Sequence, residues 1–212
     1  LKEDEAYIRI IQFTGNAEKA FTRAMRLFKE EGKKHLVLDL RGNGGGYMRI
    51  MGAIAKYFCK NAQDEFPIAA IADYGEKKKN FYASGNVYDQ YFQEDSRITV
   101  LADNQTASAS ECLIGCMIDY GAISYADICL AERGRVAKTF GKGIVQKVYS
   151  LNDGSAVKMT VSSYYSPKGI NIHGTGIEPD KVCEFDAEAY YGEEQFDNQL
   201  DYAKQVLREM ME

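Results

Sequence analysis

The sequence contains only two histidines, His35 and His173, and five scattered cysteines. A zinc site would need further His or Cys partners at ligand spacing, so we expect no metal site. The odd number of cysteines argues against a disulfide framework in a chain of 212 residues. Cys112 and Cys116 are four residues apart in an apolar stretch, so we expect both thiols to face the core.

Long apolar runs and an excess of positive charge are also missing. No run approaches the length of a transmembrane helix. Charges of both signs are mixed and the net charge is −5, which gives no electrostatic signature of nucleic-acid binding. No signal peptide is recognisable, but the sequence begins at Leu1, so this says little about targeting. With no internal repeat or low-complexity linker, we expect one domain over 1–212 with a substantial core.

The sequence has a clear alternation of strand and helix signals. Residues 6–13 predict a strand, 17–31 a helix and 35–40 a buried strand, an order that implies a parallel pair with a right-handed crossover. The polar composition of residues 73–97 predicts a segment that runs over the surface and could contain one strand. Within 122–137, Ile128–Leu130 fits strand or helix and Arg133–Arg135 fits a turn. The other predicted elements are a helix at 47–58, strands at 66–72 and 98–102, a helix closed by Gly121, a hairpin turning at 152–155, a closing loop at 174–180 and a helix in the tail from 193 to 212.

A glycine-rich loop, Arg41–Gly46, follows the second predicted strand. Such a loop can adopt positive φ and expose backbone N–H groups to a ligand. It lacks the P-loop Lys and Ser/Thr and the spacing Gly-x-Gly-x-x-Gly, which argues against a phosphate cradle. Two interpretations stay open: an oxyanion hole beside a nucleophile, or a tight turn from strand to helix.

A cluster of small hydroxyl residues, Asn104–Glu111, lies where the strand at 98–102 turns into the next helix. The first N–H groups and the dipole of that helix favour negative charge, which suits a nucleophile and an oxyanion. Ser108 and Glu111 also fit a capping box, in which Ser caps the helix and Glu follows three residues later. The cluster alone therefore allows both a catalytic and a structural interpretation.

Lys142 lies between two glycines at the start of an apolar strand, and Gln146 follows on the same strand face. If exposed, Lys142 is only a surface charge. If buried, its pKa falls and it becomes a usable general base. A Ser-His-Asp triad has few candidates, because no Asp is placed to orient His35 or His173.

Five motifs in this order closely resemble the C-terminal processing (tail-specific) serine proteases. The resemblance covers nearly the whole chain from Tyr7 to Asp180. The resemblance implies an α/β fold: a Clp protease/crotonase-like core of ββα units, with a mixed sheet flanked by helices and a C-terminal helix. The motifs are Asp39–Gly46, Thr106–Glu111, Lys138–Gln146, Tyr164–Gly169 and Gly174–Asp180.

The resemblance also implies the chemistry, that of a serine endopeptidase processing the C-terminal tails of protein or peptide substrates. Ser108 is then the nucleophile, Lys142 the general base and Gln146 the residue that orients Lys142. The oxyanion hole uses the backbone N–H groups of Ala109 and of Gly45 or Gly46, and no cofactor is implied. A Ser hydroxyl is a weak nucleophile until a base takes its proton, which a lysine with a pKa of about 7–8 can do.

The sequence departs from the family in two ways. The connection over 122–137 is longer than usual, which leaves the position of Lys142 open. The PDZ domain that usually precedes the core is not found, so either it has been trimmed away or substrates are selected differently. By resemblance we expect an extracytoplasmic or cell-envelope location and allow for a homo-oligomer.

Two rival functions follow from the same fold. One is a catalytically silent binding or scaffold protein, as in the related retinoid-binding proteins. The other is an acyl-CoA enzyme of the crotonase type, which uses a pair of oxyanion N–H groups and needs no Ser-Lys pair. The distance between the Lys142 ammonium and the Ser108 hydroxyl distinguishes an assembled protease site from the first rival.

Overall fold

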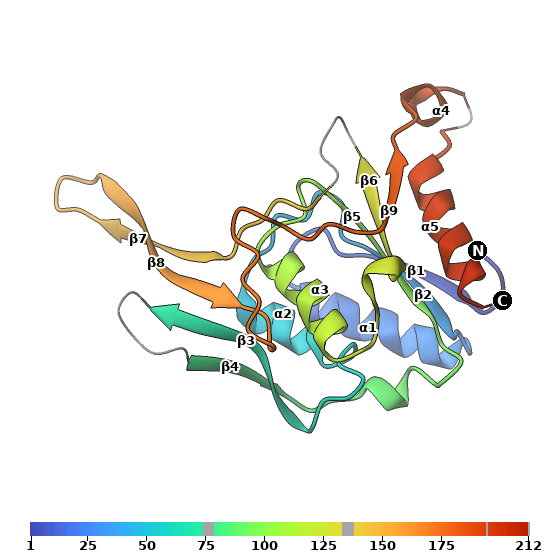
Figure 1. Ribbon diagram of the computed structural model, residues 1–212, viewed down its shortest axis with the longest axis horizontal. Helices are drawn as coiled ribbons and strands as arrows, with labels where there is room; N and C mark the ends of the chain where they lie inside the picture. The colour runs from blue at the N-terminus through green and yellow to red at the C-terminus, as the bar shows by residue number, and fades with distance from the viewer. Residues whose placement is uncertain (74–78, 133–137, 194, 212) are drawn as a thin grey trace.

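The computed structural model describes residues 1–73, 79–132, 138–193 and 195–211 (Figure 1). Its strands form a parallel five-stranded sheet in the order β1-β2-β5-β6-β9 and an antiparallel four-stranded sheet in the order β4-β3-β8-β7. The α/β class, the flanking helices and the C-terminal helix are confirmed, and the strands of the expected mixed sheet divide between these two sheets. The turn predicted at 133–135 lies outside the described residues.

The parallel sheet is covered on both faces. Alternate residues of β2 point to opposite sides: Leu36 and Leu38 join the larger core with helices α1, α2 and α3, and Val37 joins the smaller core under α5. Because both faces are buried, its central strands are continuous apolar runs. The strands are β1 (Glu5–Arg9), β2 (His35–Asp39), β5 (Ile98–Asp103), β6 (Ile128–Glu132) and β9 (Lys181–Glu184); the helices are α1 (Ala17–Glu30), α2 (Met48–Ala55), α3 (Ala109–Asp119), α4 (Ala187–Tyr191) and α5 (Asn198–Glu209).

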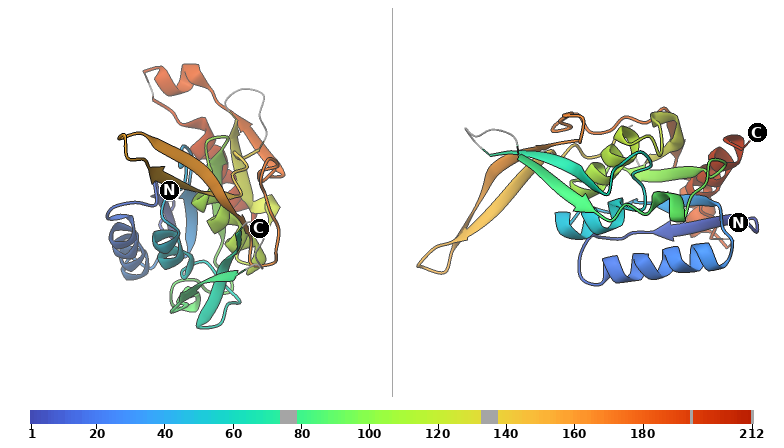
Figure 2. Two further views of the ribbon diagram at one scale, coloured as in Figure 1. Left: turned by 90° about the vertical axis from the view of Figure 1, so that its left-hand side faces the viewer. Right: turned by 90° about the horizontal axis from the view of Figure 1, so that it is seen from below.

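The antiparallel sheet contains the predicted hairpin, which is confirmed. It consists of β3 (Glu65–Asp73), β4 (Lys79–Ser84), β7 (Ile144–Ser150) and β8 (Ala156–Tyr165). Figures 1 and 2 show β7 and β8 projecting from the body of the protein as a long two-stranded arm. The base of this arm lies next to the loop that carries Lys142, so the arm is attached close to the predicted site.

Several sequence predictions are refined by the structure. The parallel pairing of β1 with β2 is confirmed, and Ile128–Leu130 is a strand. The first strand ends at Arg9 instead of residue 13. Residues 74–78 of the surface excursion predicted over 73–97 lie outside the described residues, and the described part is only partly at the surface, because Tyr88 and Phe92 are buried in the core. The short elements β9 and α4 were not predicted, since four and five residues carry too little periodicity.

The buried thiols behave as the sequence predicts. Cys112 and Cys116 are buried, and both Sγ atoms donate to the Ile68 carbonyl, at 3.3 and 2.9 Å. Burial raises the pKa of the Cys116 thiol, which keeps it protonated. They therefore pack α3 against β3 as small core residues.

An ion pair joins the first strand to the last helix and makes stability depend on pH. Arg208 donates from Nε and Nη2 to the fully buried Glu5 carboxylate at 2.7 and 2.9 Å. These hydrogen bonds lower the pKa of Glu5 to about 2, from an ordinary value of 4.5. A lowered carboxylate pKa stabilises the fold above the unfolded value, and that stability is lost as the pH falls toward the folded value.

We therefore expect the free energy of unfolding to fall between about pH 4.5 and pH 2. The Glu5 contribution is about 1–2 kcal/mol, allowing for screening at the partly exposed Arg208. Urea unfolding across this range, compared with Glu5→Gln, measures it. A Glu5→Gln variant with the same pH slope as the original chain would contradict the assignment.

No helix among the described residues combines the length and the apolar character that a bilayer crossing requires.

Candidate functional site

The glycine-rich loop and the Ser108 turn meet at one edge of the parallel sheet. They follow β2 and β5, which are adjacent and parallel, so their carboxyl ends lie side by side. The Asp103 carboxylate accepts from the Gly42 N–H at 3.0 Å, and the Thr106 hydroxyl donates to the Leu40 carbonyl at 2.9 Å. These bonds hold the two loops together.

Asn43 fixes the glycine-rich loop against the Ser108 turn. Its buried amide Nδ2 donates to the Ile10 carbonyl at 2.8 Å, and Oδ1 accepts from the Gly45 N–H at 2.9 Å. Its carbonyl accepts from the Ala107 N–H and from Ser110 Oγ, at 3.0 and 2.9 Å. One buried residue therefore connects the segment after β1, the loop and the turn, the first two through its side chain and the turn through its backbone carbonyl.

Two glycines of this loop allow a close approach that other residues would prevent. Gly45 has φ of +101°, and a Cβ there would lie 2.8 Å from Ser108 Cβ and 2.9 Å from the Ala109 nitrogen. Gly46 has φ of +146°, and a Cβ there would overlap the Phe13 carbonyl. Among the described residues, neither the Ala109 N–H nor the Gly46 N–H has a protein acceptor. Free donors therefore lie in the turn that follows Ser108 and in the adjoining loop.

Ser108 itself has a strained backbone. Its φ of 59° and ψ of −117° match the first central residue of a type II′ turn, a conformation that favours glycine. An ordinary N-cap residue is extended instead. Glu111 does accept the Ser108 N–H at 2.9 Å, and the capping box predicted for Ser108 and Glu111 is present. A serine on a strained turn from strand to helix also has the geometry of a nucleophile elbow.

The strain at Ser108 gives a stability prediction. Ser108→Gly is expected to be about 1 kcal/mol more stable than Ser108→Ala, because glycine adopts the positive φ without steric cost, while its chain entropy offsets part of the gain. Urea unfolding of the two variants measures the difference. Equal stabilities, or a more stable alanine variant, would mean that the backbone at this position is not strained.

Glu111 brings the Ser108 turn and the Lys142 loop together. Its carboxylate is buried, with Oε1 accepting from Thr139 Oγ1 at 2.6 Å and from the Gly141 N–H at 2.7 Å. Oε2 accepts from the N–H groups of Ser108 and Lys142, each at 2.9 Å. Because both backbones bind one oxygen, they lie beside each other although they are distant in sequence. The long connection over 122–137 therefore does not pull the Lys142 backbone away.

The side chains of Lys142 and Gln146 are less fully engaged. Lys142 is half-buried just before β7, and Gln146 is exposed on β7 opposite Thr160. Over the part of the chain that the structure describes, Lys142 Nζ makes no hydrogen bond to Ser108 Oγ or to Gln146. The structure brings the lysine and serine backbones together, while the ammonium–hydroxyl contact is not formed in this conformation.

Tyr164 is a site residue for which sequence analysis assigned no role. Its hydroxyl donates to the Ser108 carbonyl at 2.9 Å, and burial raises the pKa of Tyr164, so the phenol stays a donor. Asn43 and Thr139 also lie within the resembling motifs, and the residue pattern predicts no role for either. Each contributes through hydrogen bonds between distant segments, which no local pattern reveals.

Neither histidine is placed for a triad. His35 lies at the amino end of β2, the opposite end of the sheet from Ser108, with Nε2 3.5 Å from Asp4. His173 is exposed, and its described contacts include no Asp. Within residues 1–73, 79–132, 138–193 and 195–211, no cluster of His, Cys, Asp and Glu could hold a metal ion.

A cluster of buried charged residues holds the start of the glycine-rich loop in place. Arg41 donates to Asp39 and to Asp197, each at 2.8 Å from Nη2, and Tyr7 donates to Asp39 at 2.7 Å. Burial would lower the pKa of Arg41, but the hydrogen bonds to Asp197 and Asp39 outweigh it and raise that pKa. The cluster ties the start of the glycine-rich loop to the N-terminus of α5.

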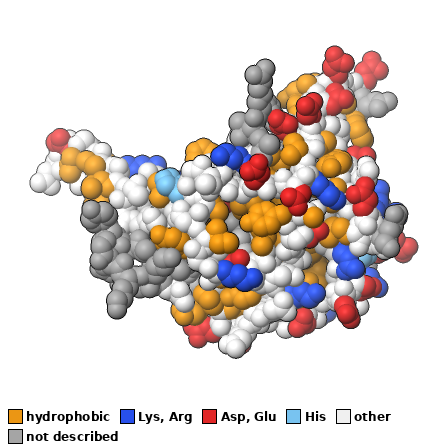
Figure 3. All heavy atoms as spheres, in the orientation of Figure 1, with side chains coloured by type: hydrophobic (Ala, Val, Ile, Leu, Met, Phe, Trp, Pro, Cys, Tyr) orange, Lys and Arg blue, Asp and Glu red, His pale blue; other side chains and the backbone are white. Residues whose placement is uncertain are grey.

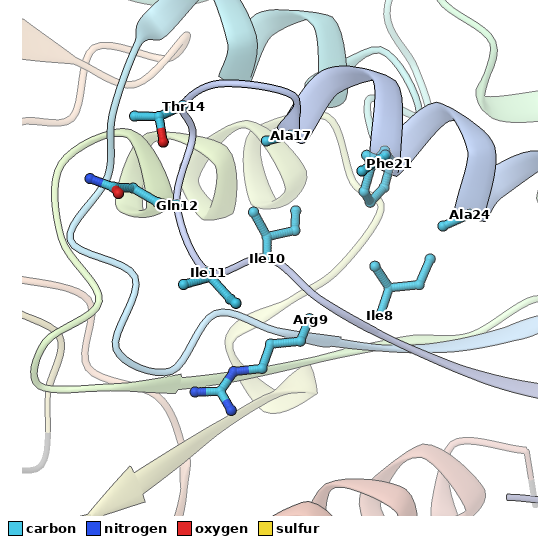
Figure 4. Close-up of a pocket in the computed structure, with 10 residues that line it drawn as sticks. Ile8, Arg9, Ile10, Ile11, Gln12, Thr14, Ala17, Phe21 and Ala24 are labelled. Carbon is cyan, nitrogen blue, oxygen red and sulfur yellow. The ribbon is translucent and has the colours of Figure 1, made fainter.

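A separate groove lies between the segment after β1 and helix α1 (Figure 4). It has a volume of about 420 Å³ and is mainly apolar. Its lining includes none of the predicted site residues, so it takes no part in the proposed chemistry. The residues lining it are Ile8, Arg9, Ile10, Ile11, Gln12, Thr14, Ala17, Ala20, Phe21 and Ala24.

Comparison with known sequences identifies relatives of the whole core. The model of Peptidase family S41 matches residues 4–183. A chloroplastic C-terminal processing peptidase of Tetradesmus obliquus is 34% identical over 181 residues, covering 84% of this chain and 35% of that protein. The carboxy-terminal processing protease CtpB of Bacillus subtilis is 33% identical over 174 residues, covering 82% and 32%. This chain thus spans about a third of the length of these curated relatives.

Solved structures give the same picture. The photosystem II D1 C-terminal processing protease has a TM-score of 0.66 and 31% identity, over 85% of this chain and 42% of that one. A putative S41 protease from Bacteroides fragilis NCTC 9343 has a TM-score of 0.73 over 98% of this chain and 55% of that one. Its identity of 20% supports the shared fold alone.

Proposed function

Because the chain belongs to peptidase family S41, we propose that it is the catalytic core of a serine endopeptidase with a Ser-Lys mechanism. The observation that carries the proposal is the Glu111 carboxylate, which binds the N–H groups of Ser108 and Lys142 through one oxygen. It holds a strained serine and the predicted base on adjacent backbones. The relatives named as C-terminal processing proteases support tail processing of protein substrates as the activity.

In the proposed reaction, Ser108 Oγ attacks the scissile carbonyl carbon while Lys142 Nζ takes the hydroxyl proton. Lys142 then returns the proton to the leaving amine. Water next attacks the acyl-enzyme, with Lys142 taking the water proton and giving it to Ser108 Oγ as the ester bond breaks and the carboxylic acid leaves. This requires the lysine side chain to turn toward Ser108, with Gln146 as the proposed acceptor that orients it. No metal or organic cofactor takes part in these steps.

The proposed oxyanion hole uses backbone donors around Ser108. The Ala109 N–H begins helix α3, where the dipole also favours the developing negative charge. Of the two glycines predicted as the second donor, Gly46 has its N–H free among the described residues. The Gly45 N–H donates to Asn43 and could serve only if that bond opened. We therefore propose Ala109 and Gly46 as the pair in the present conformation.

The rival with a specific observation behind it is a silent binding protein on the same fold. The missing hydrogen bond between Lys142 Nζ and Ser108 Oγ in the described chain favours it. The location outside the cytoplasm or at the cell envelope, and the homo-oligomer, remain predictions from the resemblance.

Hydrolysis of an unstructured protein tests the proposal. The chain is incubated with casein between pH 7 and pH 9.5, with a small p-nitrophenyl ester as a second substrate. We expect both to be cleaved, faster toward the alkaline end, because a lysine acts as a general base only in its unprotonated form. A folded chain that cleaves neither substrate at any of these pH values would favour the binding protein instead.

A further inference from the structure

We propose that the open edge of β7 binds an extended, apolar segment of the substrate as an added strand. The proposal rests on the proposed peptidase function and describes how a substrate would be positioned at the site formed by Ser108 and Lys142. Added strands bind through main-chain hydrogen bonds, while side chains alternate into neighbouring pockets. The backbone, the side chains and the position of β7 each support it.

The backbone of β7 has a free row of hydrogen-bonding groups. Leu151 N–H donates to Ser155 and Tyr164 N–H donates to Gly143, which fixes the odd-numbered residues of β7 as those bonded to β8. Hydrogen-bonding direction alternates along an antiparallel pair. The N–H and C=O groups of Ile144, Gln146, Val148 and Ser150 therefore point to the other edge. Among the described residues, β7 pairs only with β8, so this edge is unoccupied.

One face of the arm is exposed and carries four apolar side chains, with Lys147 opposite Met159 on the same face. In the register of the two strands, Tyr149 lies opposite Val157, and Met159 follows on the same face. These side chains are 45%, 42% and 52% exposed, and Leu151 at the tip is 47% exposed. Figure 3 shows hydrophobic side chains on the projecting arm. A two-stranded ribbon is stabilised when a third strand pairs with it and when apolar side chains of a partner pack on its apolar residues.

The position of the β7 edge beside the predicted site makes a substrate peptide the occupant that fits it best. β7 begins two residues after Lys142, whose backbone is bound with that of Ser108 by Glu111. A peptide paired along Gln146 to Ser150 would therefore run directly toward the nucleophile. The substrate segment must be extended and unstructured, because the backbone groups of a folded segment are already paired. It must also be apolar on the face that meets the arm.

The test uses proline to remove one outward N–H. Val148→Pro deletes an edge donor but no bond of the β7–β8 ladder. Ala156→Pro is the matched control, because its N–H lies on the opposite edge of the same ribbon and the charge is unchanged. Both are made in a Ser108→Ala background, and binding of fluorescein-labelled casein is measured by fluorescence anisotropy, with circular dichroism to verify folding.

We expect Val148→Pro to weaken casein binding at least tenfold and Ala156→Pro to change it less than twofold. Equal effects of the two prolines, no effect of either, or no casein binding by Ser108→Ala would overturn the proposal. So would a dimer, seen by sedimentation velocity, that Val148→Pro dissociates without weakening casein binding, because the edge would then pair two copies. If this binding pattern holds while the unmutated chain hydrolyses neither casein nor ester, the peptidase proposal fails and the docking edge stands.

Discussion

Ser108→Ala is expected to lower kcat/KM for casein by at least about 10⁴-fold while leaving the fold intact. The reason is that no other group can form the acyl-enzyme, and only binding and oxyanion stabilisation remain. Alanine keeps the backbone strain and the Glu111 contact, because both depend on the main chain. The measurement is initial-rate hydrolysis with circular dichroism and thermal unfolding on the same samples.

Lys142→Ala belongs to the same prediction and is expected to cost about 10²–10⁴-fold, the usual contribution of a general base. Lys60→Ala, an exposed lysine away from the site, is the charge-matched control and should retain the original rate. A Lys142→Ala variant with the rate of the control would remove the lysine from the mechanism. An active Ser108→Ala variant would contradict the assigned nucleophile.

Glu111→Ala is expected to give the largest loss of stability of any single substitution at the site. It leaves four donors in a buried region without their acceptor, and each unpaired group costs about 1–3 kcal/mol. A loss of at least about 4 kcal/mol is expected, a large part of the stability of a typical domain. Urea unfolding measures it, with soluble yield as a second indicator.

Glu111→Gln separates positioning from folding. It keeps one acceptor oxygen but places an amide against two donors, so we expect about 1–3 kcal/mol of destabilisation and about a 100-fold lower kcat/KM from displaced catalytic groups. Glu94→Gln removes an exposed carboxylate and should change neither quantity. Full activity in a folded Glu111→Gln variant would show that Glu111 does not position Ser108 and Lys142.

The elements that sequence predicted well are those whose burial is continuous or periodic. The apolar runs of β2 and β5 reflect burial on both faces of the sheet, and the helical spacing of α1 reflects packing of one helix face against the larger core, so a short window contains the signal. β9 and α4 were missed because each is too short for a period. The 73–97 segment was misjudged in part, since Tyr88 and Phe92 are buried by residues far away in sequence.

The candidate site also contains residues that local sequence patterns predict and residues that they do not. Ser108, Lys142 and the glycines follow from local residue patterns and from the family resemblance. Sequence could not decide whether Ser108 only caps a helix or also acts as a nucleophile, because a residue pattern does not give the backbone angle, which is a φ of 59° in the structure. The bonds from Glu111 to Thr139, Gly141 and Lys142, and the Tyr164 contact, depend on segments that meet only in the folded chain.

The most direct test is the rate at which a fluorophosphonate probe labels Ser108, followed by mass spectrometry of the digested chain. We predict a single modified serine at position 108 and labelling at least 100-fold slower in Lys142→Ala. Labelling of another serine, or equal rates with and without the Lys142 amine, would contradict the central claim that Lys142 activates Ser108.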